Sequence, residues 1–178
     1  MILAKVCVLG EVSVGKTSLI RRYVDRAFSD EYLSTVGVKI SRKLLHLASS
    51  PTGNETDLQF VLWDLEGGRN SLDISATYLK GARGAIVVGD VTRSSTMEGL
   101  QGHIVRFRDV NPTGRVVIAL NKVDLLAEVN EPPADHWTDS PGVLALMSTS
   151  AKTGSGVDEL FTALGMSILQ DTGHASDL

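Results

Sequence analysis

The sequence predicts a three-layer α/β/α domain, in which about five helices cover both faces of a six-stranded, mostly parallel sheet with one antiparallel edge hairpin. Two observations support this fold class. Apolar runs of strand length alternate with helical patterns along the chain, which is typical of parallel strands joined by helices. A glycine-rich GxxxxGK[S/T] loop, Gly10 to Thr17, joins the first apolar run to the first helical pattern, as in phosphate-binding α/β domains.

The expected elements follow from hydrophobic periodicity. Apolar runs predict strands at Ile2–Leu9, Val36–Leu47, Leu58–Asp64, Ala85–Asp90, Arg115–Leu120 and Val143–Ser148. Helical spacing predicts helices at Lys16–Asp25, Asn70–Lys80, Ser94–Asp109 and Val157–Gln170. A polar stretch with Pro51 and Gly53 separates the second and third strands, so these two should form the antiparallel hairpin. Pro132, Pro133 and Pro141 leave room for only a short, irregular helix between residues 128 and 141.

Length and composition limit the possible classes. The chain has 178 residues, 43% of them hydrophobic, which suits one domain with a sizeable core. The formal net charge of -4 argues against nucleic-acid binding, because no basic face is available to displace counterions. The single cysteine, Cys7, cannot form an internal disulfide, and no apolar run approaches the roughly 18 residues of a membrane span. We expect a domain over residues 1–170, a flexible tail over 171–178 and a cytoplasmic location.

The glycine-rich loop is the first candidate site. Gly10 and Gly15 let the backbone turn tightly, so that successive N–H groups point at phosphate oxygens. Lys16 adds a charge for the outer phosphates, Thr17 offers a hydroxyl to Mg²⁺, and the following helix directs its positive end to the same place. The residues expected to line the phosphates are Glu11, Val12, Ser13, Val14, Gly15, Lys16, Thr17 and Ser18.

Three further motifs follow predicted strands, where ligands of such sheets bind. Asp64 and Gly67 form a DxxG pattern, in which the carboxylate can hold a metal ion through water and the glycine N–H can meet a terminal phosphate. Asn121-Lys122-Val123-Asp124 places Asp124 where its carboxylate can accept two hydrogen bonds from guanine, a pattern that adenine lacks. Thr149-Ser150-Ala151-Lys152 would add a backbone N–H near the guanine oxygen.

With these four motifs in order, the chain resembles the Ras superfamily of small GTPases, and within it the Rab branch, over about residues 1 to 170. The resemblance implies binding of GTP, GDP and Mg²⁺, with the metal ion on Thr17, on Thr35 and, through water, on Asp64. It also implies that Phe28 stacks on guanine and that Asp30 lies near the ribose. The guanine-reading positions would be Asn121, Lys122, Asp124, Ser150, Ala151 and Lys152.

The same resemblance implies how the protein works. Two loops, residues 28–38 (the first switch loop) and 64–78 (the second switch loop), would become more or less ordered depending on whether the γ-phosphate is present. The same loops would bind effector, exchange-factor and activating proteins. The catalytic positions would be Lys16, Thr35, Gly67 and Gly68. The terminal cysteine and basic tract of the family are not found, so no direct lipid anchor is expected.

Two departures from the family pattern bear on catalysis. Gly68 stands where the family has a glutamine that orients the attacking water, and Val12 stands where small residues are usual and would obstruct an inserted arginine. We therefore expect slow hydrolysis. Whether the GTP-bound state is the default or Glu66, Arg69 or Asn70 replaces the glutamine stays open, as does whether Glu66 faces solvent or activates water.

Three hypotheses follow. The first is a molecular switch with slow intrinsic GTP hydrolysis. The second is a nucleotide-binding scaffold, or pseudo-GTPase, that docks effectors with negligible turnover. The third, an ATP-using kinase, is disfavoured because Asn121 to Asp124 favours guanine.

Overall fold

The computed structural model describes residues 1–31, 34–48, 55–67, 74–126 and 137–174. One six-stranded sheet has the order β2-β3-β1-β4-β5-β6. Its strands are β1 (Ile2–Leu9), β2 (Val38–Ala48), β3 (Glu55–Leu65), β4 (Gly84–Asp90), β5 (Arg115–Asn121) and β6 (Val143–Thr149). Neighbouring strands pair in parallel, except for the antiparallel hairpin of β2 and β3 at one edge. The predicted fold class and its edge hairpin are therefore confirmed.

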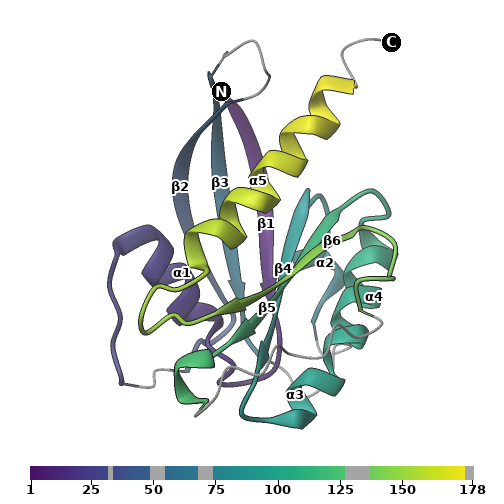
Figure 1. The fold of residues 1–178 in the computed structure, drawn as a ribbon. Helices are drawn as coiled ribbons and strands as arrows, with labels where there is room; N and C mark the ends of the chain where they lie inside the picture. Colours follow the sequence, from purple (N-terminus) through teal and green to yellow (C-terminus); the bar gives the residue numbers. More distant parts are fainter. Residues whose placement is uncertain (32–33, 49–54, 68–73, 127–136, 175–178) are drawn as a thin grey trace.

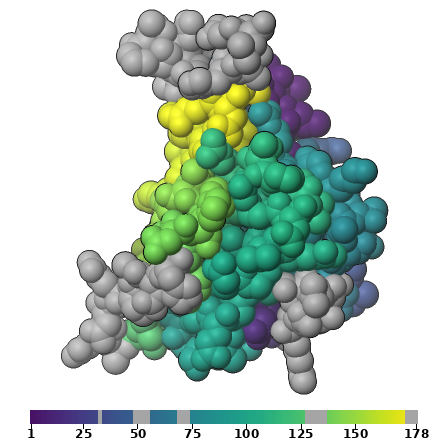
Figure 2. Space-filling model, turned by 90° about the vertical axis from the view of Figure 1, so that its right-hand side faces the viewer, coloured from purple at the N-terminus to yellow at the C-terminus, as the bar shows by residue number. Residues whose placement is uncertain are grey.

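Helices cover both faces of the sheet. The helices on one face are α1 (Lys16–Asp25) and α5 (Val157–His174), and those on the other are α2 (Ala76–Leu79), α3 (Ser94–Glu98) and α4 (Leu100–Val110) (Figure 1). Figure 2 looks onto the second face, with α4 (green-teal) near the centre and the end of α5 (yellow) above it. Within the described residues, no helix combines the length and apolar character needed to cross a membrane.

The sheet divides the core into two clusters because side chains alternate along each strand. In β1, Val6 and Val8 pack under α1 and α5, whereas Cys7 and Leu9 pack under α4. All four are fully buried. The second half of β1, Val6 to Leu9, is covered on both faces, which explains why all four of these residues are apolar.

Three elements differ from the sequence predictions. The helix expected at Ser94–Asp109 is interrupted at Gly99, which separates α3 from α4. Helix α5 continues to His174, so the prediction of a tail from Asp171 onwards is wrong for its first four residues. Asp171 instead forms an ion pair with Arg115 of β5, which holds this turn of the helix to the sheet. The helix predicted at 70–80 is represented by α2, and its first residues lie outside the described ranges, as do the hairpin tip and residues 127–136.

Candidate functional site

The loop between β1 and α1 needs its two glycines for contacts within the protein. Gly10 and Gly15 have φ angles of +146° and +102°, which favour glycine. A Cβ atom at Gly10 would lie 2.4 Å from the carbonyl oxygen of Val88, and one at Gly15 would lie 2.3 Å from Nδ2 of Asn121. The loop therefore packs directly against the ends of β4 and β5.

Side-chain donors of the protein hold the carbonyl groups of this loop. Five consecutive carbonyl oxygens accept hydrogen bonds: Gly10 and Glu11 from Lys16 Nζ, Val12 from Arg93, Ser13 from Lys122 and Val14 from Asn121. The carbonyl and the N–H of a trans peptide point in opposite directions. Donors that hold these carbonyls therefore also fix the orientation of the N–H group at the other side of each peptide, and an anion-binding loop requires N–H groups that are fixed in this way.

Lys16, the lysine of the loop, is largely buried at 6% exposure. Its Nζ donates to the carbonyl oxygens of Gly10 at 3.0 Å and Glu11 at 2.7 Å. Burial lowers the pKa of Lys16 to about 8, against the opposing charge of Asp64. The position suits a lysine that binds an anionic ligand, because negative charge close to Nζ would favour the protonated form of Lys16.

Three oxygen-bearing side chains meet beside Lys16. The Thr17 hydroxyl lies 2.7 Å from the Thr35 hydroxyl and donates to Asp64 Oδ2 at 2.5 Å. Asp64 is 1% exposed, and its Oδ1 has no hydrogen-bond partner among the described residues. Burial raises the pKa of Asp64, while the hydrogen bond from Thr17 opposes this. A buried carboxylate with a free oxygen next to two hydroxyls is a donor set that suits a hard divalent cation such as Mg²⁺.

The base-reading end is built from the ends of β5 and β6. Asn121 Oδ1 accepts hydrogen bonds from the Ala151 N–H and the Thr149 hydroxyl, both at 3.2 Å. Asp124 accepts a hydrogen bond from the Ser150 hydroxyl at 2.6 Å. Asn121 thus joins the base-reading loop to the phosphate-binding loop through a single buried side chain.

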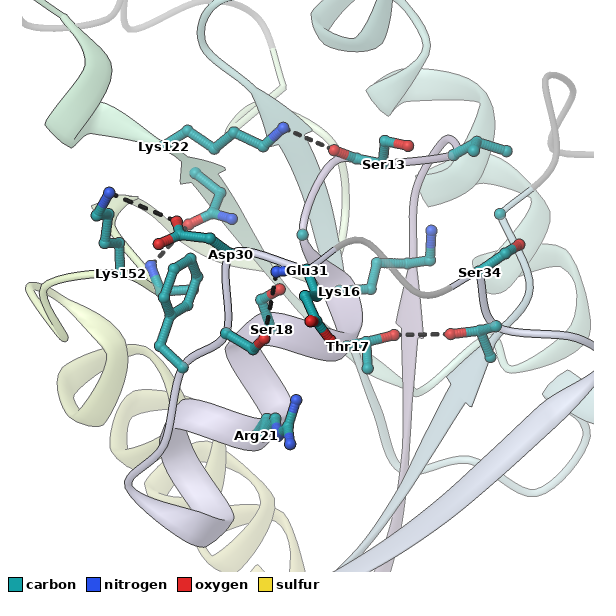
Figure 3. Close-up of a pocket in the computed structure, with 18 of the residues that line it drawn as sticks. Ser13, Lys16, Thr17, Ser18, Arg21, Asp30, Glu31, Ser34, Lys122 and Lys152 are labelled. Atoms are coloured by element: carbon teal, nitrogen blue, oxygen red, sulfur yellow. Dashed lines mark hydrogen bonds and ion pairs between the residues drawn. The ribbon is translucent and has the colours of Figure 1, made fainter.

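A cavity of about 930 Å³ connects the two ends (Figure 3). In Figure 3, Lys122 reaches Ser13 at one side, and Lys152 lies 3.5 Å from Asp30 at another. The predicted residues that line the cavity are Val12, Ser13, Gly15, Lys16, Thr17, Ser18, Phe28, Asp30, Thr35, Gly67, Asn121, Lys122, Asp124, Ala151 and Lys152. Glu11, Val14, Asp64 and Ser150 are not among the residues that line the cavity, and Gly68, Arg69 and Asn70 fall outside the described residues.

Glu66 connects the two switch loops. Its carboxylate accepts a hydrogen bond from the Gly37 N–H at 2.9 Å, and its own N–H donates to the Gly37 carbonyl at 2.9 Å. The side chain is exposed, but it is engaged by the first switch loop. This contact is a third arrangement besides the solvated glutamate and the water-activating base considered from the sequence.

Sequence reasoning missed three residues that support the site, namely Asp90, Arg93 and Arg22. Asp90, at the end of β4, forms ion pairs with Lys122 at 2.7 Å and Arg93 at 3.2 Å. Burial alone would raise the pKa of Asp90, but hydrogen bonds from Lys122 and Thr92 hold it below its usual value. Arg22 of α1 donates to the carbonyl oxygens of residues 151 and 152. Asp90 follows a strand, so the rule that located the other motifs would also have indicated it.

Comparisons with known proteins agree with this geometry. The family model described as "Ras family" matches residues 5–170. Rab-32 of Mus musculus is 34% identical over 165 residues, which cover 88% of this chain and 71% of that protein. Rab-31 of Rattus norvegicus is 31% identical over 168 residues, with coverage of 92% and 82%. The GTP-binding protein ypt5 of Schizosaccharomyces pombe is 34% identical over 165 residues, with coverage of 90% and 75%. The chain therefore belongs to the Ras family and is a Rab-like small GTPase.

Proposed function

We propose that this small GTPase is a molecular switch that hydrolyses GTP slowly and favours its GTP-bound form. The observation that carries the proposal is the contact of Thr35, from the first switch loop, with Thr17 beside buried Lys16. A switch loop whose threonine already lies at the metal and phosphate end is arranged as a triphosphate would require.

Mg²⁺ would be held by the hydroxyls of Thr17 and Thr35 and, through water, by Asp64. The free Oδ1 of Asp64 and the hard oxygen donors support this assignment. When bound, the ion neutralises charge that develops between the outer phosphates. Lys16 contributes a second positive charge at the same end of the cavity.

The residues around Gly67 would bind the terminal phosphate but leave the attacking water unsupported. A Cβ atom at Gly67 would lie 2.7 Å from both Lys16 Nζ and the Val12 nitrogen. A glycine backbone can therefore approach where a side chain cannot, and its N–H can meet the phosphate. The next residue, Gly68, has no side chain to orient water, and the hydrolysis step should be slow.

Asp124 would select guanine. Its Oδ1 is oriented by the Ser150 hydroxyl at 2.6 Å, and both the carboxylate and the Ala151 region line or border the cavity. A fixed carboxylate accepts hydrogen bonds from guanine N1–H and the 2-amino group. ATP should therefore compete poorly with GTP.

Protein partners would bind the switch loops. Val36 of the first switch loop is 87% exposed, and Ile40 of the adjoining strand β2 is 50% exposed, so apolar surface is available to a partner there. Effectors, exchange factors and activating proteins are the expected classes. The cytoplasmic location stays a prediction.

Single-turnover hydrolysis of Mg²⁺–GTP tests the proposal. Wild type is compared with Gly68→Gln, and Lys16→Ala gives the background without phosphate binding. We expect slow hydrolysis in wild type and a faster rate in Gly68→Gln. A wild-type rate equal to that of Gly68→Gln would overturn the assignment of Gly68. If GTP stays unchanged after long incubation with wild type and with Gly68→Gln, the scaffold hypothesis is favoured instead.

A further inference from the structure

A second cavity lies at the other end of the sheet from the cavity assigned to GTP. Its volume is about 780 Å³, and it is lined by the loop before β4, the end of α4, the loop between α4 and β5, and α5. Arg115, the first residue of β5, lines this cavity, whereas Asn121, the last, lines the other (Figure 1). The seven residues of β5, at about 3.3 Å each, place the two cavities roughly 20 Å apart.

Three arginines of the second cavity converge on the start of β5. The Arg115 N–H donates to the Arg83 carbonyl oxygen at 3.0 Å. The Arg108 guanidinium donates to the Gly114 carbonyl oxygen at 2.7 Å. Arg83, Arg108 and Arg115 therefore enter one cavity from the loop before β4, from α4 and from β5.

The charges of this cavity are not balanced. Among the described residues that line it, three arginines stand against one acidic residue, Asp171, which leaves an excess of two positive charges. Asp171 binds Arg115 through both carboxylate oxygens, so the excess belongs to Arg83 and Arg108. The whole chain, by contrast, has a formal net charge of -4. Like charges placed together repel each other, and an anion between them would remove that repulsion.

Arg108 is held in place, whereas the Arg83 side chain is available to a ligand. A Cβ atom at Gly142 would lie 2.5 Å from Nη1 of Arg108 and 2.8 Å from its Cζ, so the guanidinium packs directly on this backbone. The Arg83 side chain is half-buried and has no hydrogen-bond or ion-pair partner among the described residues. One fixed and one unengaged guanidinium can therefore donate to the same anion.

The chemistry of the cavity indicates a phosphate group. Guanidinium groups bind phosphate oxygens through paired N–H···O bonds. A phosphomonoester has three free oxygens and a charge of about -1.5 to -2 at pH 7, which matches the excess of two positive charges, whereas a carboxylate would neutralise only one. The volume of about 780 Å³ falls in the range of small-molecule sites, roughly 300 to 1,000 Å³. The cavity thus has room for an organic part beside the phosphate.

We propose that this second cavity binds a phosphomonoester group, with Arg83 and Arg108 as its main donors. The same group occurs in soluble molecules such as glycerol 3-phosphate and in the head group of phosphatidic acid, and the two arginines would recognise it in either. A bound phosphate would link the loop before β4 to α4. The site goes beyond the proposed switch function and does not depend on the assignment of the GTP cavity.

An NMR titration of ¹⁵N-labelled protein with glycerol 3-phosphate tests the proposal. Excess GDP and Mg²⁺ are present throughout, and sodium chloride keeps the ionic strength constant. We expect saturable shifts of the Gly114 and Gly142 amide signals, with a dissociation constant on the order of 1 mM. The amides of Ser13 and Val14, in the phosphate-binding loop, should not move. If only these loop amides respond, or if no amide responds, the proposal is overturned.

Substitutions of the two arginines show whether they carry the binding. Arg83→Ala should weaken binding about three- to tenfold, since one partly exposed charged hydrogen bond is lost. Arg108→Ala should have a similar effect, and if it does not fold, Arg83→Ala decides, because no described contact of the fold depends on the Arg83 side chain. Arg42→Ala removes an exposed arginine of β2 and should bind as wild type does. Equal affinities of Arg83→Ala and wild type would refute the assignment.

Vesicle sedimentation separates the two sources of the phosphate. Vesicles of phosphatidylcholine and phosphatidic acid in equal parts are compared with vesicles of phosphatidylcholine alone. Binding that requires phosphatidic acid and is lost in Arg83→Ala identifies a lipid head group, whereas an NMR response without vesicle binding identifies a soluble ligand. Vesicle binding that persists in Arg83→Ala counts against the lipid source, because it does not involve this cavity.

Discussion

Glu66 and Gly37 bind each other twice, once through the two backbones and once from the Gly37 N–H to the Glu66 carboxylate. The pair joins the first switch loop to the second, next to the strands β2 and β3. Because Thr35 lies two residues before Gly37, the contact also limits how far Thr35 can move from Thr17. Glu66, for which the sequence left a solvated position open, therefore links the two switch loops.

Glu66→Ala should loosen this contact. The Gly37 N–H would lose its side-chain acceptor, so its hydrogen exchange should accelerate several-fold while the backbone bond remains. Glu66→Gln is the matched control, because its amide oxygen can still accept. Hydrogen exchange followed by NMR checks the result, and equal protection of Gly37 in all three proteins would contradict it.

Gly67→Ala should impair binding of the terminal phosphate. The added Cβ would lie 2.7 Å from Lys16 Nζ and 2.8 Å from the carbonyl carbon of Glu11, so the second switch loop must move away from the phosphate-binding loop. We expect the affinity for a GTP analogue to fall at least about tenfold, with a smaller effect on GDP. Calorimetric titration measures both.

Gly99→Ala provides the control for that variant. Gly99 has a helical φ of -71°, and the nearest neighbour of its Cβ position is the flexible end of Glu11, at 3.0 Å. Its nucleotide affinities should match wild type. If Gly67→Ala also matched wild type, the close approach of Gly67 to the loop would not persist in the bound state.

Arg22→Ala should weaken binding of both GDP and GTP. The Arg22 guanidinium donates to the carbonyl oxygens of Ala151 at 2.7 Å and Lys152 at 2.6 Å, and so fixes the base-reading loop to α1. We expect fluorescent GDP to dissociate about tenfold faster, because two charged hydrogen bonds are lost. The control is Arg42→Ala. An unchanged rate would show that the loop holds its shape without Arg22.

His103 should make the protein less stable as pH falls. The side chain is 2% exposed, and burial lowers its pKa to about 4, below the ordinary value of 6.5. Between these two values the unfolded chain binds more protons than the folded one, so the free energy of unfolding decreases as pH falls through this window. The largest loss attributable to His103 is about 3 kcal/mol.

Urea unfolding at several pH values checks this prediction. His103→Gln should flatten the dependence between about pH 6.5 and 4. If His103→Gln and wild type lose stability in parallel, His103 does not contribute to the acid sensitivity.

The sequence predicted best the two elements on either side of the phosphate-binding loop. β1 and α1 have the predicted bounds, because the largely apolar run ends at the glycine of the loop and the helical pattern begins at its lysine. The ends of β2 and β3 depend on pairing: Glu55 joins β3 because it lies opposite Ala48, although its own residue type disfavours strands.

The site could be predicted wherever a motif follows a strand, but the two arginines that support it, Arg22 and Arg93, could not. Arg93 and Val12 are 81 positions apart, and Arg22 and Ala151 are 129 apart. No local spacing reports such contacts, since they depend on how helices pack against the sheet. The break of the predicted helix at Gly99 could not be located from the sequence either. A glycine in a helical pattern lowers the helix propensity, but it does not show whether the helix is interrupted there.

The close fit of Gly15 against Asn121 ties together two motifs more than a hundred positions apart. Any side chain at position 15 would collide with the Asn121 amide, and that amide also holds the Val14 carbonyl at 3.0 Å. Natural variation at either position is therefore constrained by the other, and drift in one motif would have to be matched in its counterpart. For protein engineering, the two motifs form a single transplantable unit: grafting the phosphate-binding loop into another scaffold without an asparagine at the facing strand end would transfer the pattern but not its support.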